Sequence, residues 1–225
     1  MCHLLAARAE TLPLVGCHVL ELGAGVGMLG IVAAQLGAAG VSITDMHDLC
    51  LCAASINVAL NGVIPVSHVA PLRFGAAEVA DFYEASHSTG PGPQATYPLI
   101  VATDIVYSDE TIVSMFETIH AMLERSDRAV FLLGWVQRSR GATVASLEKG
   151  ATTAGFTWTV VDATAQSDLV RSYAQQKQQL TCWHSNRPVH ERAQGKVRVW
   201  EFRWSMQTLL DLEEDDYWAQ YESNH

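Results

Sequence analysis

The sequence predicts an α/β fold with a largely parallel sheet, and three observations lead to this prediction. Short apolar segments typical of buried strands alternate with helical segments as far as residue 161, a pattern that requires right-handed crossovers between parallel strands. Six glycines lie between residues 23 and 40, where a strand gives way to a helix. The alternation breaks after residue 161, because a polar, Gln-rich segment over residues 163–195 precedes one more strand.

Each predicted element has a local signal. Strands are short runs rich in Val, Ile, Leu and aromatic residues, whereas helices place apolar residues at helical spacing and stop near Gly or Pro. The predicted strands cover residues 18–22, 41–44, 66–69, 98–103, 129–135, 156–161 and 196–204. The predicted helices cover residues 4–11, 29–36, 48–60, 110–123 and 144–154, with a further short helix around residues 169–179. Residues 84–97 have the composition of a loop.

Length and charge limit the function classes. A chain of 225 residues can form one domain with a full core, and we expect this domain over residues 1–207 with an acidic tail over residues 208–225. The formal net charge is −10, which argues against a nucleic-acid-coating protein, since such proteins need clustered positive charge. The charges are segregated: residues 1–112 carry ten acids and two basic groups, and residues 125–203 carry six acids and twelve basic groups.

Cysteine usage predicts free thiols. The number of cysteines is odd and no Cys-x2-Cys pair occurs among Cys2, Cys17, Cys50, Cys52 and Cys182. This pattern favours reduced thiols over a disulfide framework or a zinc site. We therefore expect no metal and a location in the cytoplasm, with the nucleus as the second choice.

One stretch imitates a membrane span. Residues 22–44 carry no charge, and an apolar run of this length normally suggests a transmembrane helix. Its six glycines suit a continuous helix poorly, and Glu21 and Asp45 bracket it. We interpret it as strand, turn, helix and strand buried in protein, and since the N-terminus lacks signal-peptide character, we expect no membrane association.

The glycine cluster predicts a ligand-binding loop. Gly23, Gly25 and Gly27 permit a tight turn and let backbone N–H groups approach a ligand. The run from Gly25 to Gly30 also matches G-x-G-x-x-G, and Asp45 follows 20 residues after Gly25, where an acid can bind ribose hydroxyls. The alternative is an ordinary tight turn of an α/β sheet.

Two features favour S-adenosylmethionine (SAM) over NAD as the ligand. Glu21 lies two residues before Gly23, and a carboxylate there suits a cationic ligand and repels a pyrophosphate. The spacing Gly23-x-Gly25-x-Gly27 after an acid also resembles motif I of class I methyltransferases. A dehydrogenase that binds NAD is the alternative for this loop.

A second motif follows the fourth predicted strand. Thr103-Asp104-Ile105-Val106-Tyr107 lies at its carboxyl end, and ligands of open α/β sheets bind beside those ends. Asp104 and Tyr107 are therefore expected to face the same crevice as the glycine loop. The alternative is that Asp104 caps the next helix and Tyr107 simply packs, but Ser108 or Asp109 is better placed for the cap.

Four motifs together resemble the seven-β-strand protein lysine methyltransferases, which are often named as nicotinamide N-methyltransferase-like proteins. The resemblance covers about residues 4–204. It rests on motif I, on Asp45 with a helical N-x-x-x-N, on a segment similar to Leu-x-Trp-Gly with Phe for Trp, and on a D-x-x-Y signature. In the chain these are residues 19–27, Thr44-Asp45 with Asn57 and Asn61, Leu72-Arg73-Phe74-Gly75, and Asp104 with Tyr107.

The resemblance implies a Rossmann-like sheet in the order 3-2-1-4-5-7-6, with strand 7 antiparallel. It implies SAM bound by the glycine loop, ribose held by Asp45 and adenine placed near Phe74. The expected cofactor-binding residues are Glu21, Gly23, Ala24, Gly25, Gly27, Asp45, Met46, Arg73, Phe74 and Thr103. Asp104 and Tyr107 are expected to border the methyl-acceptor pocket as catalytic residues.

The chain also departs from this family. Its members usually carry a longer N-terminal region with a Trp that covers the cofactor, whereas 17 residues without Trp precede His18 here. The expectation is either an incomplete cover or a start upstream.

The implied function is SAM-dependent methylation of a lysine side chain in a non-histone protein by a monomeric enzyme. An apolar pocket favours the neutral amine of the lysine, Asp104 can orient it, and the Tyr107 ring can contact a methylammonium. A negative cleft suits cationic SAM and a basic, lysine-bearing segment. Two alternatives stay open: a small-molecule N-methyltransferase and a non-catalytic SAM-fold interaction module.

Overall fold

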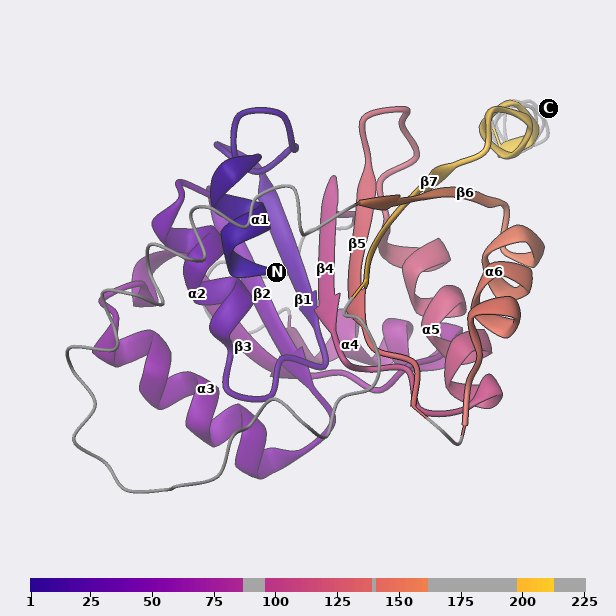
Figure 1. The fold of residues 1–225 in the computed structure, drawn as a ribbon. Helices are drawn as coiled ribbons and strands as arrows, with labels where there is room; N and C mark the ends of the chain where they lie inside the picture. The colour runs from indigo at the N-terminus through magenta and orange to yellow at the C-terminus, as the bar shows by residue number, and fades with distance from the viewer. Residues whose placement is uncertain (87–95, 139–140, 162–197, 213–225) are drawn as a thin grey trace, which may run out of the picture.

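The computed structural model describes residues 1–86, 96–138, 141–161 and 198–212. They form one seven-stranded sheet in the order β3-β2-β1-β4-β5-β7-β6 (Figure 1). The strands are β1 (His18–Leu22), β2 (Gly40–Asp45), β3 (Ser67–Pro71), β4 (Leu99–Thr103), β5 (Val130–Trp135), β6 (Phe156–Val161) and β7 (Arg198–Trp204). The predicted strand order is confirmed.

Strand direction follows the prediction as well. β1 pairs in parallel with β2 and β4, with Glu21 opposite Ile43 on one side and Val101 on the other. The parallel pairing extends to β3 and β5. β7 runs antiparallel to both β5 and β6, which accounts for the break in the strand–helix alternation.

Helices cover both faces of the sheet. The helices are α1 (Cys2–Ala7), α2 (Met28–Gln35), α3 (Asp48–Leu60), α4 (Ala76–Ser86), α5 (Asp109–Met122) and α6 (Val144–Thr153). One apolar cluster joins α1, α2 and α3 to the sheet, and a second cluster joins α4, α5 and α6 to the opposite face (Figure 1). All residues of β2 and β5 are buried, as expected for strands covered on both sides.

Two helix predictions are wrong in part. The predicted helix over residues 4–11 ends at Ala7, because the chain turns at Arg8, whose guanidinium pairs with Glu201. Helix α4 was not predicted, and its last turn occupies residues 84–86 of the predicted loop. Its apolar contacts come mainly from Val79, Phe82 and Tyr83, a pattern too sparse to stand out among its alanines.

The uncharged stretch over residues 22–44 is the end of β1, the glycine loop, α2 and most of β2, as predicted. No helix in the described part of the chain is both long and apolar enough to cross a membrane. Residues 206–212 are helical, and Leu209 and Leu212 pack against the core. The rest of the predicted acidic tail and the predicted helix around residues 169–179 lie outside the described residues.

Candidate functional site

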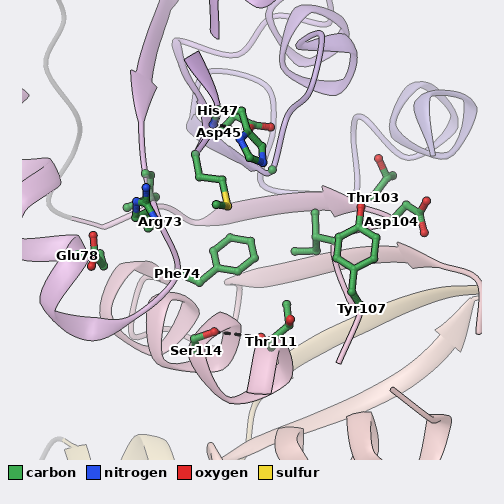
Figure 2. Close-up of a pocket in the computed structure, with 14 residues that line it drawn as sticks. Asp45, His47, Arg73, Phe74, Glu78, Thr103, Asp104, Tyr107, Thr111 and Ser114 are labelled. Carbon is green, nitrogen blue, oxygen red and sulfur yellow. Dashed lines mark hydrogen bonds between the residues drawn. The ribbon is translucent and has the colours of Figure 1, made fainter. Parts of the chain in front are cut away.

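A pocket of about 580 Å³ opens at the carboxyl ends of β1 to β4. Its size is typical of small-molecule and cofactor sites. Figure 2 shows the Phe74 ring pointing into its centre, with Arg73 and Glu78 at one side and Asp104 and Tyr107 at the other. The lining residues are Gly23, Asp45, Met46, His47, Leu72, Arg73, Phe74, Glu78, Thr103, Asp104, Ile105, Tyr107, Thr111 and Ser114.

The glycine loop needs its glycines for conformation and for space. Gly23, Gly25 and Gly27 all have positive φ, between +55° and +80°, where other residues are strained. A Cβ on Gly23 would lie 2.5 Å from Cγ2 of Ile105. The loop can therefore approach the segment after β4 only with glycine at this position.

Glu21 lies beneath the loop and not in the pocket. Its two carboxylate oxygens accept hydrogen bonds from the backbone N–H groups of Leu29, at 3.1 Å, and Gly30, at 2.8 Å. These are orphan donors of the first turn of α2. Burial raises the pKa of Glu21 to about 7, partly offset by these hydrogen bonds, and the charge of Asp45 raises it further. In this structure Glu21 holds the first turn of α2 against the loop, and it is not among the residues that line the pocket.

Asp45 ties the loop to the end of β2. Its Oδ2 accepts from Gly25 N at 2.8 Å and its Oδ1 from His47 N at 2.9 Å. A carboxylate has about four acceptor positions, so two remain for hydroxyl donors. Because Asp45 also lines the pocket, this geometry suits the expected pair of ribose hydroxyls.

The segment after β4 has an unusual backbone. Among the described residues other than glycine, Asp104 alone has a positive φ, +55°. Ser108 is the N-cap of α5 and accepts from Thr111 N at 3.3 Å, so the alternative of Asp104 as the cap is excluded. The Asp104 and Tyr107 side chains are about half exposed, and both line the pocket.

Asp104 and Tyr107 share one cationic neighbour. Arg138 Nη2 lies 2.5 Å from Asp104 Oδ2, and Arg138 Cζ lies 5.0 Å from the centroid of the Tyr107 ring. Arg138 therefore contacts both candidate catalytic side chains.

The structure brings most of the predicted site residues together. The pocket is lined by eight of them: Gly23, Asp45, Met46, Arg73, Phe74, Thr103, Asp104 and Tyr107. The other four, Glu21, Ala24, Gly25 and Gly27, belong to the loop or its support and are not among the lining residues.

Six lining residues were not predicted: His47, Leu72, Glu78, Ile105, Thr111 and Ser114. Three of them, His47, Leu72 and Ile105, are next to predicted residues in the chain, so their position in the sequence could have identified them. Thr111 and Ser114 are three positions apart near the start of α5, where neighbouring positions share one helix face. Glu78 belongs to α4, the helix that was not predicted.

The pocket is acidic. Three carboxylates line it, from Asp45, Glu78 and Asp104, against the guanidinium of Arg73 in the lining and that of Arg138, which pairs with Asp104. Within the described ranges, no group of three or more His, Cys, Asp or Glu side chains could hold a metal ion. This charge favours a cationic ligand by attraction.

Known proteins share both the fold and part of the sequence. A zebrafish (Danio rerio) protein named protein N-lysine methyltransferase METTL21A is 39% identical over 122 residues, which is 53% of this chain and 50% of that protein. Mouse (Mus musculus) methyltransferase-like protein 22 is 29% identical over 153 residues, 59% of this chain and 36% of that protein. The chain thus spans half or less of the length of these two relatives.

Solved structures resemble the fold. The magnesium protoporphyrin IX methyltransferase of Synechocystis PCC 6803, with bound SAM, has a TM-score of 0.55 and 16% identity, covering 91% of this chain and 76% of that chain. A SAM-dependent methyltransferase from Mesorhizobium loti has a TM-score of 0.57 and 14% identity, covering 90% and 98%. The model of the family described as "Lysine methyltransferase" matches residues 3–144. This match spans the glycine loop, Asp45 and the Asp104–Tyr107 segment, and the chain belongs to the lysine methyltransferase family.

Proposed function

We propose that this protein transfers a methyl group from SAM to the side-chain amine of a lysine in a protein substrate. One observation carries the proposal: the glycine loop with Asp45, and the pair Asp104 and Tyr107, open into the same acidic pocket. This arrangement supports a cofactor half beside an acceptor half, in a chain of the lysine methyltransferase family.

The residues present fit the cofactor. Gly23 lines the pocket without a side chain, Asp45 keeps two acceptor positions, and Phe74 offers an aromatic face. SAM, when bound, supplies an electrophilic methyl group on a positively charged sulfonium. The carboxylates of the pocket favour that charge.

The acceptor side has to hold an amine in line for displacement. Positioning and exclusion of water contribute most to such a reaction. Asp104 can orient the amine by accepting a hydrogen bond from it, and the Tyr107 ring can contact a methylammonium through its face. Ile105, which lies between them in the chain, contributes an apolar wall.

Radiolabelled SAM tests the proposal in a protein lysate. We expect label in a discrete protein band with the unaltered protein and at least about a tenfold lower rate with Asp104→Asn, because one lost charge-assisted hydrogen bond corresponds to about 1.5–3 kcal/mol. Asn tolerates the positive φ of Asp104, so this variant removes the charge without adding backbone strain. Asp109→Asn, five residues along and absent from this pocket, is the control and should retain the rate.

The labelling experiment and a binding titration together separate the alternatives. Label in low-mass material only would favour a small-molecule N-methyltransferase and contradict the protein substrate. No saturable SAM binding in calorimetry would contradict both enzymes and leave a non-catalytic module. Saturable NAD binding in its place would point to a dehydrogenase.

We further propose that the substrate presents its lysine in a basic segment, that the protein acts as a monomer and that it works in the cytoplasm or nucleus. The acidic pocket supports the first statement. Free thiols at Cys2, Cys17, Cys50 and Cys52 fit a reducing compartment. A native mass measurement and imaging of the tagged protein in cells test the other two.

A further inference from the structure

In the proposed acceptor pocket, a side chain of the protein already occupies the position where a substrate cation would bind. A lysine amine would need the Asp104 carboxylate for orientation and the Tyr107 ring for contact. The Arg138 guanidinium is ion-paired with that carboxylate at 2.5 Å and lies over that ring at 5.0 Å. A guanidinium is a cation that suits both a carboxylate and an aromatic face, so it makes both contacts expected of the substrate.

The position of Arg138 is built into the backbone. Asp104 N donates to Gly134 O at 2.8 Å, and the buried Trp135 Nε1 donates to Val106 O at 2.9 Å. Beyond Arg138, Ala142 N donates to Tyr107 O at 3.3 Å. The chain is therefore hydrogen-bonded to the Asp104–Tyr107 segment both before and after Arg138.

The contact is also displaceable. The Arg138 and Asp104 side chains are each 52% exposed, and exposed ion pairs contribute little net free energy. An arginine side chain has many rotamers in solution, which offsets part of the attraction further. Arg138 can thus occupy the site in the free protein and still leave it.

We propose that Arg138 is an internal competitor for the acceptor site, so that a substrate ammonium or amine binds only by displacing its guanidinium from Asp104 and Tyr107. The inference rests on the proposed function for the roles of those two residues. It assigns to Arg138 a control of acceptor affinity: the residue weakens binding of every cation at this site, so a substrate needs further contacts elsewhere to bind tightly.

The test uses n-butylammonium chloride, which has the chemistry of a lysine side chain. Its binding is followed through the ring resonances of Tyr107, assigned with Tyr107→Phe, at constant ionic strength set by NaCl. We expect Arg138→Gln to lower the apparent Kd by about two- to five-fold, the range expected for loss of one exposed ion pair. Arg128→Gln makes the same charge change at an exposed residue beside the opposite end of β5, and should leave the Kd unchanged.

An unchanged or higher Kd in Arg138→Gln would overturn the inference, and so would an equal decrease in Arg128→Gln, which would indicate only a general effect of charge. Loss of SAM binding in Arg138→Gln, measured by calorimetry, would assign Arg138 a structural role and also overturn it. The proposed function fails separately, when no protein in the lysate is labelled, because the ammonium titration does not depend on methyl transfer.

Discussion

At the scale of single residues, the site depends on backbone conformations that most side chains avoid. Asp104 holds φ at +55°, a conformation that costs an ordinary L-residue roughly 1–2 kcal/mol and that Asp tolerates better than most. The strained residue is one of the three acidic residues that line the pocket, and its carboxylate pairs with Arg138. Strain of this kind gathers at functional sites, where the surrounding structure enforces it.

Gly23 offers the sharpest test of the loop. Gly23→Ala adds a Cβ 2.5 Å from Cγ2 of Ile105 at a φ of +59°, so the loop has to move away from the pocket. We expect SAM affinity in calorimetry to fall at least about tenfold, which corresponds to about 1.4 kcal/mol.

Gly62→Ala is the matched control for that substitution. Gly62 has a φ of +70° but no atom within 4 Å of an added Cβ, so the variant carries the same backbone strain without the clash. Gly62→Ala should lose roughly 1 kcal/mol of unfolding free energy in urea, Gly23→Ala should lose at least as much because of its clash, and only Gly23→Ala should lose SAM affinity. Equal SAM affinity in the two variants would show that the loop is not at the cofactor.

Local sequence predicted the residues that end strands and missed those that join the site from helices. Asp45 and Asp104 follow parallel strands, whose carboxyl ends meet at one edge of a sheet. Glu78 and Ser114 reach the pocket only because α4 and α5 pack side by side on one face. That placement depends on tertiary packing, which one chain's periodicity does not encode.

At the scale of elements, the extensions of β4 and β5 form the frame of the proposed acceptor side. Trp135, at the end of β5, is buried and donates its indole N–H to Val106 O at 2.9 Å. It thereby fixes the chain between Asp104 and Tyr107. The frame joins two neighbouring parallel strands beyond the point where their regular pairing ends.

Trp135→Phe tests whether this frame positions the acceptor residues. The substitution leaves the Val106 carbonyl without its donor, at a cost of about 1–3 kcal/mol, and allows the segment to shift. We expect a lower kcat for methyl transfer with unchanged SAM affinity. Trp204→Phe removes a similar indole bond, to Glu124 O at 2.8 Å, and should cost stability without lowering kcat. An equal loss of kcat in both variants would mean that lower stability alone causes the loss.

The elements themselves differed in how strongly the sequence encoded them. The predicted helix over residues 48–60 and strand over residues 156–161 coincide with α3 and β6, because turn residues or Gly bound each run. Helix α1 ended early and α4 went unpredicted. Both segments make long-range contacts: Arg8, the C-cap of α1, pairs with Glu201, and α4 packs on α5 and β3.

At the scale of the whole molecule, two buried carboxylates make stability depend on pH in opposite directions. Burial alone would raise the pKa of Glu201, but hydrogen bonds and charges from Arg8 and Arg203 outweigh it and hold the pKa below its usual value. Arg8 links the end of α1 to Glu201 in β7, and Arg203 pairs with the same carboxylate from within β7. The stabilisation of this carboxylate is present above the pKa of unfolded Glu and is lost as the pH falls below it. The stability contributed by Glu21 changes with pH in the opposite direction.

Glu21→Gln isolates the second effect. Glu21 titrates near pH 7 when folded and near 4.5 otherwise, so the folded state binds the proton more tightly. Its contribution is complete below pH 4.5 and is lost as the pH rises through 7, a change of about 3 kcal/mol. We expect urea unfolding free energies of the unaltered protein to fall by about this amount, relative to Glu21→Gln, between pH 5 and pH 8.

The amide of Glu21→Gln cannot accept both N–H bonds, which lowers the variant's stability at every pH, so the slopes and not the absolute values are compared. Glu10→Gln, at an exposed carboxylate, should keep the slope of the unaltered protein. A slope in Glu21→Gln equal to that of the unaltered protein would mean that Glu21 stays ionised beneath the loop, and the two N–H bonds from α2 would then outweigh its burial.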